Sequence, residues 1–100
     1  MTAPFGLTER EVALIRNVLA RHPEISGALL FGSRAKGTAR PASDIDIALE
    51  GAIGPLVGAS VAEELDELPL PYRFDVVTLT NIDHRPLLEH IQRVGIRIAG

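Results

Sequence analysis

The 100-residue sequence contains no cysteine and no tryptophan. Without cysteine the chain can form no disulfide, thiol nucleophile or thiolate metal site, which excludes several enzyme classes and fits a reducing compartment. The sequence also lacks an apolar run near the ~20 residues that a membrane span needs. Residues 1–6 lack the charged and apolar regions of a signal peptide. These absences predict a cytoplasmic protein with no membrane partner.

Strong positive charge is missing as well. The net charge of −3 and the pI of about 5.5 argue against a protein whose main task is to coat nucleic acid. The few basic residues are unevenly placed, because Arg34, Lys36 and Arg40 fall within one short segment. Positive charge at that point suits a metal-bound polyphosphate, and the plainer alternative is a solvated loop.

The length and the order of periodic segments predict a single domain over residues 1–100, of the α/β (α+β) class. Thr8 and Glu11 have the capping-box spacing at the start of the first helix. Asn81 or Asp83 is expected to cap the last helix, and Gly95 to end it. The predicted helices cover about 8–21, 55–68 and 83–94, and the predicted strands about 26–31, 43–49, 72–79 and 96–98. We therefore expect a small mixed sheet of three or four strands with flanking helices.

The segment from Gly32 to Asp46 carries the chemistry. An apolar run, residues 28–31, leads into Gly32-Ser33, as expected of a buried strand that ends in a tight turn. Such a turn can offer backbone N–H groups and a hydroxyl to phosphate. Further along, Asp44 and Asp46 alternate with isoleucines, so both carboxylates point to one face of a strand. Two like charges side by side are costly unless a cation lies between them.

A third carboxylate, Asp75, lies in the strand predicted over residues 72–79. Phe74 and Val76 would share one face of that strand and Asp75 the other. If this strand lies about 4.8 Å from the one that carries Asp44 and Asp46, the three carboxylates converge. Hard oxygen ligands favour Mg²⁺ or Mn²⁺, and two ions ~3.5–4 Å apart suit an in-line phosphoryl displacement.

Each part alone has a plainer explanation, such as an ordinary turn, an exposed strand end or a surface carboxylate. Two rival motifs fail. Gly32 and Gly37 have the glycine spacing of a P-loop, but Thr38 stands where lysine is required. An EF-hand that begins at Asp44 would need glycine where Leu49 stands. The joint order of turn, basic linker, paired carboxylates and later carboxylate favours a two-metal site.

The histidines do not predict a metal site. His22 precedes a proline, and His84 and His90 are six residues apart, on different sides of one predicted helix. We expect all three to be structural or to face solvent.

The pattern of Gly32-Ser33, Asp44-Ile45-Asp46 and Asp75 resembles the signature of the DNA polymerase beta-like nucleotidyltransferase superfamily. The string over residues 32–47 is most similar to the minimal nucleotidyltransferases, the MNT antitoxins encoded beside HEPN-domain toxins. The resemblance covers about residues 7–79 and implies a nucleotidyltransferase fold.

The resemblance also implies roles for individual residues. The Gly32 N–H and the Ser33 hydroxyl would hold the β- and γ-phosphates of ATP, the substrate. Asp44 and Asp46 would bind two Mg²⁺ ions, with Mn²⁺ as the other possibility. Asp75 would complete the metal site and accept the proton of the acceptor. Arg34 or Lys36 would neutralise the departing pyrophosphate.

The function that the resemblance implies is that of a protein adenylyltransferase, an antitoxin that transfers AMP to a tyrosine of a HEPN ribonuclease toxin. Related antibiotic-modifying enzymes carry an additional helical domain that shapes the acceptor pocket, and 100 residues leave no room for one. The acceptor is therefore expected to bring its own surface, in a hetero-oligomer. Two alternatives stay open: an antitoxin that masks the toxin and leaves the nucleotide site unused, and nucleotide transfer to a small molecule or an RNA end.

Overall fold

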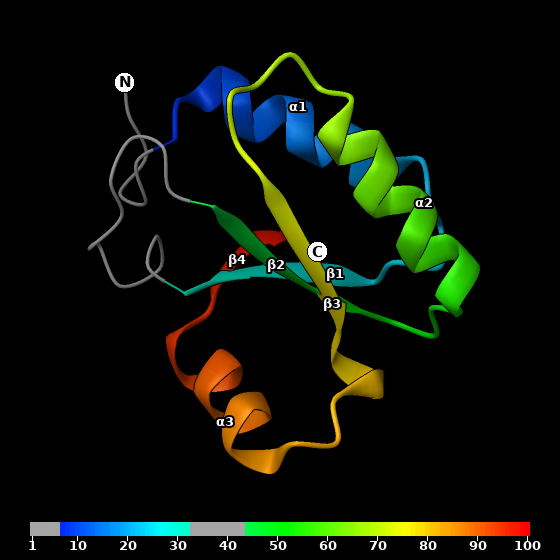
Figure 1. The fold of residues 1–100 in the computed structure, drawn as a ribbon, viewed down its shortest axis with the longest axis vertical. Helices are drawn as coiled ribbons and strands as arrows, with labels where there is room; N and C mark the ends of the chain where they lie inside the picture. The colour runs from blue at the N-terminus through cyan, green and yellow to red at the C-terminus, as the bar shows by residue number, and fades with distance from the viewer. Residues whose placement is uncertain (1–6, 33–43) are drawn as a thin grey trace.

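The computed structural model describes residues 7–32 and 44–100, shown in Figure 1. Along these residues the chain forms an α+β arrangement of helices and strands, as the sequence predicts. The helical elements are α1 (Glu9–Ala20), α2 (Pro55–Asp66), the 3-10 turn η1 (Leu79–Asn81) and α3 (Arg85–Val94). The strands are β1 (Gly27–Phe31), β2 (Ile45–Glu50), β3 (Phe74–Thr78) and β4 (Ile96–Ala99).

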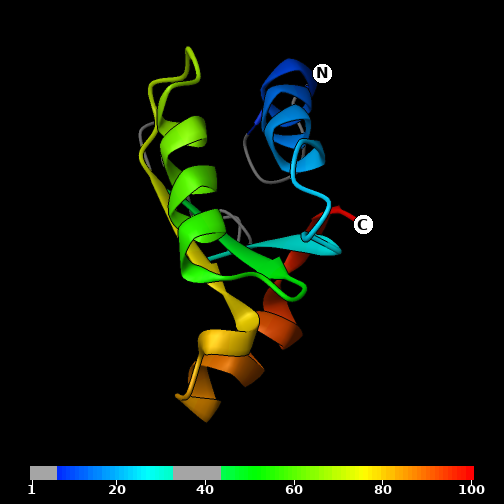
Figure 2. The ribbon, with the colours of Figure 1, turned by 90° about the vertical axis from the view of Figure 1, so that its right-hand side faces the viewer.

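The four strands form one mixed sheet in the order β3-β2-β1-β4. β1 runs antiparallel to β2 and to β4, whereas β2 and β3 are parallel. Figure 1 shows α1 and α2 over one face of the sheet and α3 below the other. In the side view of Figure 2, α1 and α2 lie next to each other above the strands. The predicted mixed sheet with flanking helices is confirmed.

The hydrophobic core lies mainly between the sheet and the pair α1 and α2. Ile45, Ile47 and Leu49 of β2 are fully buried there, together with Ile15 of α1 and Leu65 of α2. This burial stabilises β2 in the sheet, because well-packed aliphatic side chains each contribute about 1.5–3 kcal/mol when buried.

A smaller cluster covers the opposite face of the sheet, where Leu29 and Ala48 pack with Ile91 of α3. Side chains alternate along a strand, so Asp46 lies on the same face as Ala48. The face that carries Asp46 is thus covered by α3 only along part of its length. In the residues that the structure describes, no helix is long and apolar enough to cross a bilayer.

The capping box at the start of α1 is confirmed. The Glu11 N–H donates to Thr8 Oγ1 at 3.1 Å, and the Thr8 N–H donates to Glu11 Oε1 at 2.8 Å. The cap predicted for α3 is wrong: His84 occupies the N-cap position and makes no side-chain capping hydrogen bond. Asn81 does not cap α3 because it is the last residue of η1. In that turn the Ile82 N–H donates to Leu79 O at 3.2 Å.

His22 has a structural role, one of the two that the sequence suggests. Its Nε2 lies 2.5 Å from Oε2 of Glu64, and so joins the end of α1 to α2. Arg21 contacts the same carboxylate at 3.4 Å. The hydrogen bond from His22 is the main cause that lowers the pKa of Glu64 below its ordinary value of 4.5. This contact fixes the two helices that cover the core face of the sheet.

We predict that Glu64→Gln lowers the midpoint of thermal unfolding by a few degrees at neutral pH. Because the pKa of Glu64 is lowered on folding, its contribution is present above pH 4.5 and is lost as the pH falls below that value. Calorimetry across the pH range should therefore show wild type and variant converging in acid. Glu63→Gln, an exposed neighbour in α2, is the matched control, and an equal effect there would contradict the assignment.

Candidate functional site

The turn at Gly32, which we call the Gly32 turn, follows β1 directly and requires glycine for two reasons. Its φ of +74° lies in the left-handed region that side chains disfavour. A Cβ added there would also collide with Oδ2 of Asp46 and lie 3.1 Å from its Cγ. The antiparallel register explains the approach, since Phe31 lies opposite Asp46. The turn predicted to bind phosphate therefore rests directly on the predicted metal ligand.

The parallel pairing of β2 and β3 brings the aspartates together. Asp46 and Asp75 are direct register partners, and the Ile45 N–H donates to Arg73 O at 2.8 Å where the pairing begins. Asp44 immediately precedes β2. Asp46 is half-buried, whereas Asp44 and Asp75 are exposed. The conditional prediction that the Asp75 strand lies beside the Asp46 strand is confirmed, and we call these three aspartates the carboxylate cluster.

Within residues 7–32 and 44–100, no positive charge compensates the negative charge of the cluster. Burial raises the pKa of Asp46 above its ordinary value, and repulsion from Asp75 and then from Asp44 raises it further. None of the three carboxylates has a hydrogen-bond or ion-pair partner among residues 7–32 and 44–100. A partly buried carboxylate without a partner is destabilising, and a divalent cation is the group that relieves such repulsion. The donor set, oxygen only, fits Mg²⁺ or Mn²⁺.

The cluster is not a closed metal cage. Within the described part of the chain, no group of three histidine, aspartate or glutamate side chains is arranged to hold a metal ion. This is the usual situation for Mg²⁺, which keeps several waters and binds through one or two carboxylates together with substrate phosphates. The geometry therefore suits an ion that enters with a phosphate-bearing substrate.

A surface hollow of about 530 Å³ opens beside the cluster, and we call it the β3 hollow. Its lining residues are Asp44, Asp66, Arg73, Phe74 and Asp75. Sequence reasoning missed Asp66 and Arg73. The alternation that places Asp75 on one face extends to Arg73, two positions earlier, and was the available signal for that residue. Asp66 at the end of α2 carried no comparable signal.

Three predicted nucleotide-binding residues, Ser33, Arg34 and Lys36, lie outside the described residues. The helical turn expected to end at Gly37 lies outside them as well. The roles predicted for these side chains therefore stay predictions, and the described site consists of Gly32 and the carboxylate cluster.

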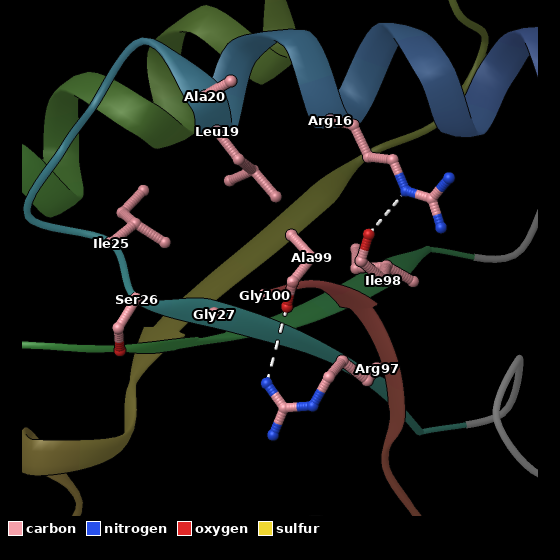
Figure 3. Close-up of a pocket in the computed structure, with 10 residues that line it drawn as sticks. All are labelled: Arg16, Leu19, Ala20, Ile25, Ser26, Gly27, Arg97, Ile98, Ala99 and Gly100. Carbon is pink, nitrogen blue, oxygen red and sulfur yellow. Dashed lines mark hydrogen bonds between the residues drawn. The ribbon is translucent and has the colours of Figure 1, made fainter.

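A second hollow, of about 510 Å³, lies at the other end of β1, around Gly27. Figure 3 shows Arg16 on one side of it, where Nε donates to Ile98 O at 2.6 Å, and Arg97 on the other, directed to Ala99 O at 3.4 Å. Its lining includes no aspartate or glutamate. Because β1 separates this hollow from Gly32, it takes no part in the carboxylate site.

We predict that Asp46→Asn stabilises the protein in the absence of divalent cations. Removal of one charge from the cluster relieves repulsion, so the midpoint of thermal unfolding should rise by about 2–5 °C. Added Mg²⁺ with an ATP analogue should raise the midpoint of the wild type and not of the variant. Asp83→Asn, an exposed aspartate outside the site, is the control. A lower midpoint for Asp46→Asn in chelator would contradict the electrostatic account.

We predict that Gly32→Ala destabilises the protein by about 1–2 kcal/mol, since alanine at this φ is strained and its Cβ displaces Asp46. Gly58→Ala is the matched control: it lies inside α2, and its Cβ would meet only Thr78 Oγ1, at 3.7 Å. The control should stabilise by about 0.5–1 kcal/mol through helix propensity. Denaturant unfolding measures both, and equal effects would contradict the packing of the Gly32 turn on Asp46.

Comparison with known proteins agrees with this geometry. The profile of the family described as "Polymerase beta, Nucleotidyltransferase" matches residues 14–100. A Haemophilus influenzae protein named "Probable protein adenylyltransferase MntA" is 28% identical over 93 residues, which cover 89% of this chain and 82% of that protein.

Solved structures share the fold. A crystal structure of a toxin–antitoxin with AMP-PNP gives a TM-score of 0.76 at 26% identity, over 89% of this chain and 73% of that one. The structure of a tri-AMPylated Shewanella oneidensis HEPN toxin in complex with MNT antitoxin gives 0.71 at 22% identity, over 92% of this chain and 71% of that one. The resemblance to minimal nucleotidyltransferases is thus confirmed. With its profile match spanning Gly32 and the carboxylate cluster, the chain belongs to the polymerase beta nucleotidyltransferase family.

Proposed function

We propose that the chain is a protein adenylyltransferase that acts as an antitoxin, transferring AMP from ATP to a tyrosine of a HEPN-domain toxin. One observation carries this proposal. The left-handed Gly32 turn packs against Asp46, and Asp46 lies in register with Asp75, so the turn that we expect to bind phosphate adjoins carboxylates that no described residue neutralises.

The reaction is a displacement at the α-phosphorus of ATP. The tyrosine oxygen forms a bond to that phosphorus, the bond to the bridging oxygen of the β-phosphate breaks, and pyrophosphate leaves with the electron pair. The Gly32 N–H would hold the polyphosphate at the end of β1, which fixes the direction in which pyrophosphate departs. Asp75 is exposed and lies beside Asp46 on the adjacent strand. It would accept the proton of the tyrosine hydroxyl.

Asp44, Asp46 and Asp75 would supply the ligands for Mg²⁺ or Mn²⁺, one or two carboxylates to each ion, together with phosphates of the substrate. When bound, the ion would neutralise the negative charge that develops on the phosphates during transfer. The chain's own contribution is the fixed spacing of these side chains, because β2 is anchored by the buried Ile45 and Ile47 on its other face. The pairing of β2 with β3 keeps the backbones of Asp46 and Asp75 side by side.

The acceptor is inferred from the relatives. The Haemophilus influenzae relative is named as a protein adenylyltransferase, and a structural relative at 26% identity is a toxin–antitoxin with AMP-PNP. The Shewanella oneidensis complex contains a HEPN toxin that is tri-AMPylated, bound to an antitoxin with the same fold. Among the described residues the β3 hollow lies at the surface beside the cluster, which supports a protein acceptor, since a small molecule is normally enclosed by its pocket.

We predict that ATP labelled at the α-phosphate transfers its label to the co-purified HEPN toxin in the presence of Mg²⁺, and that chelation stops the transfer. Asp44→Ala/Asp46→Ala should lower the rate by at least about a thousandfold, since the charge-neutralising ion loses its ligands. Asp83→Asn is the control and should retain the wild-type rate.

A further variant, Asp75→Asn, separates catalysis from masking. Cells that express the toxin should lose protection with Asp75→Asn, although the variant still binds the toxin in a pull-down. Full protection by Asp75→Asn, without label on the toxin, would contradict the enzymatic proposal and favour an antitoxin that acts by binding alone.

A further inference from the structure

The order of strands defines two sides of the reaction centre. Gly32 follows β1, Asp46 lies on the adjacent β2, and Asp75 lies on β3, at the edge of the sheet. In an in-line displacement the nucleophile enters opposite the leaving group. With the polyphosphate on the Gly32 turn, pyrophosphate departs over β1 and the acceptor approaches over β3. The β3 hollow is therefore on the acceptor's side, an assignment that rests on the proposed function.

Among the residues that the structure describes, Arg73 is the only basic one that lines the β3 hollow, and it is exposed. Its backbone is fixed, because Arg73 O accepts a hydrogen bond from the Ile45 N–H at the start of the β2 and β3 pairing. The hollow also contains three carboxylates, those of Asp44, Asp66 and Asp75. Yet the Arg73 guanidinium forms no ion pair within 4.0 Å with any carboxylate in the described part of the chain.

The position of Arg73 does not suit the triphosphate. The Gly32 turn and Asp46 are neighbours across β1 and β2, whereas Arg73 precedes β3, beyond Asp75. A guanidinium presents a planar fork of donors that binds carboxylate or phosphate through two hydrogen bonds. The three carboxylates described in the hollow repel anions. The Arg73 guanidinium is the described group there that can bind a negatively charged group.

We propose that Arg73 is a specificity-determining residue that binds a carboxylate side chain of the acceptor protein next to the modified hydroxyl. This contact sets the register of the acceptor segment, so that its hydroxyl lies beside Asp75 when the carboxylate lies on Arg73. Asp44, Asp66 and Asp75 disfavour acceptor segments with further negative charge in the same hollow.

The test is steady-state kinetics with the purified HEPN toxin as acceptor, in which ATP and toxin are varied independently. Arg73→Glu should raise the KM for the toxin by at least about tenfold, the loss expected for a charge-assisted contact, and leave the KM for ATP unchanged. Arg73→Lys, which keeps the charge and loses the planar fork, should fall between wild type and Arg73→Glu. Arg93→Glu, an exposed reversal on α3, is the matched control and should behave as the wild type.

Three results would overturn the proposal. If the KM for ATP rises instead, Arg73 binds the nucleotide. If neither KM changes while the thermal midpoint equals that of the wild type, Arg73 is a solvated surface residue. If the wild type itself does not label the toxin, the proposed function fails and this inference fails with it, a result distinct from a labelled toxin whose KM is insensitive to Arg73.

Discussion

The site depends on the pairing of β2 with a neighbour on each side. Its antiparallel neighbour β1 delivers the Gly32 turn onto Asp46, and its parallel neighbour β3 sets Asp75 opposite the same residue. Backbone hydrogen bonds along both ladders hold the backbones of these residues on neighbouring strands. The sheet thereby brings three separate stretches of sequence together, with the Gly32 turn, Asp46 and Asp75 in successive positions across it.

Stability and function oppose each other at Asp46. Burial and the two neighbouring carboxylates raise its pKa, and no described residue offsets this repulsion. The opposite face of β2 supplies the compensating free energy, because Ile45, Ile47 and Leu49 are fully buried under α1 and α2. The unfavourable charge at Asp46 is thus tolerated because the rest of β2 is well packed. Such local instability is common at functional sites of otherwise stable proteins.

Local features of the site could be predicted from sequence, and long-range ones only in part. Strand alternation predicts that Asp44 and Asp46 share a face, because it needs only neighbouring residues. The parallel register that pairs Asp46 with Asp75 joins strands separated by a helix. The sequence therefore predicts that the carboxylates converge only if these two strands are neighbours in the sheet. Arg73 was missed although it lies within the strand predicted over residues 72–79, because it belongs to no motif. The α3 cap was wrong because Asn81 belongs to η1, a 3-10 turn with no strong local signal, and because His84 and not Asp83 occupies the N-cap position.

The most direct test of the account is the anomalous diffraction of Mn²⁺ in crystals of the protein grown with AMP-PNP. The account predicts Mn²⁺ peaks against Asp46 and Asp75, with the polyphosphate of the analogue on the Gly32 turn. Two peaks about 3.5–4 Å apart would identify the two-ion arrangement. Nucleotide bound elsewhere, for example in the hollow between Arg16 and Arg97, with no Mn²⁺ at the carboxylate cluster, would contradict it.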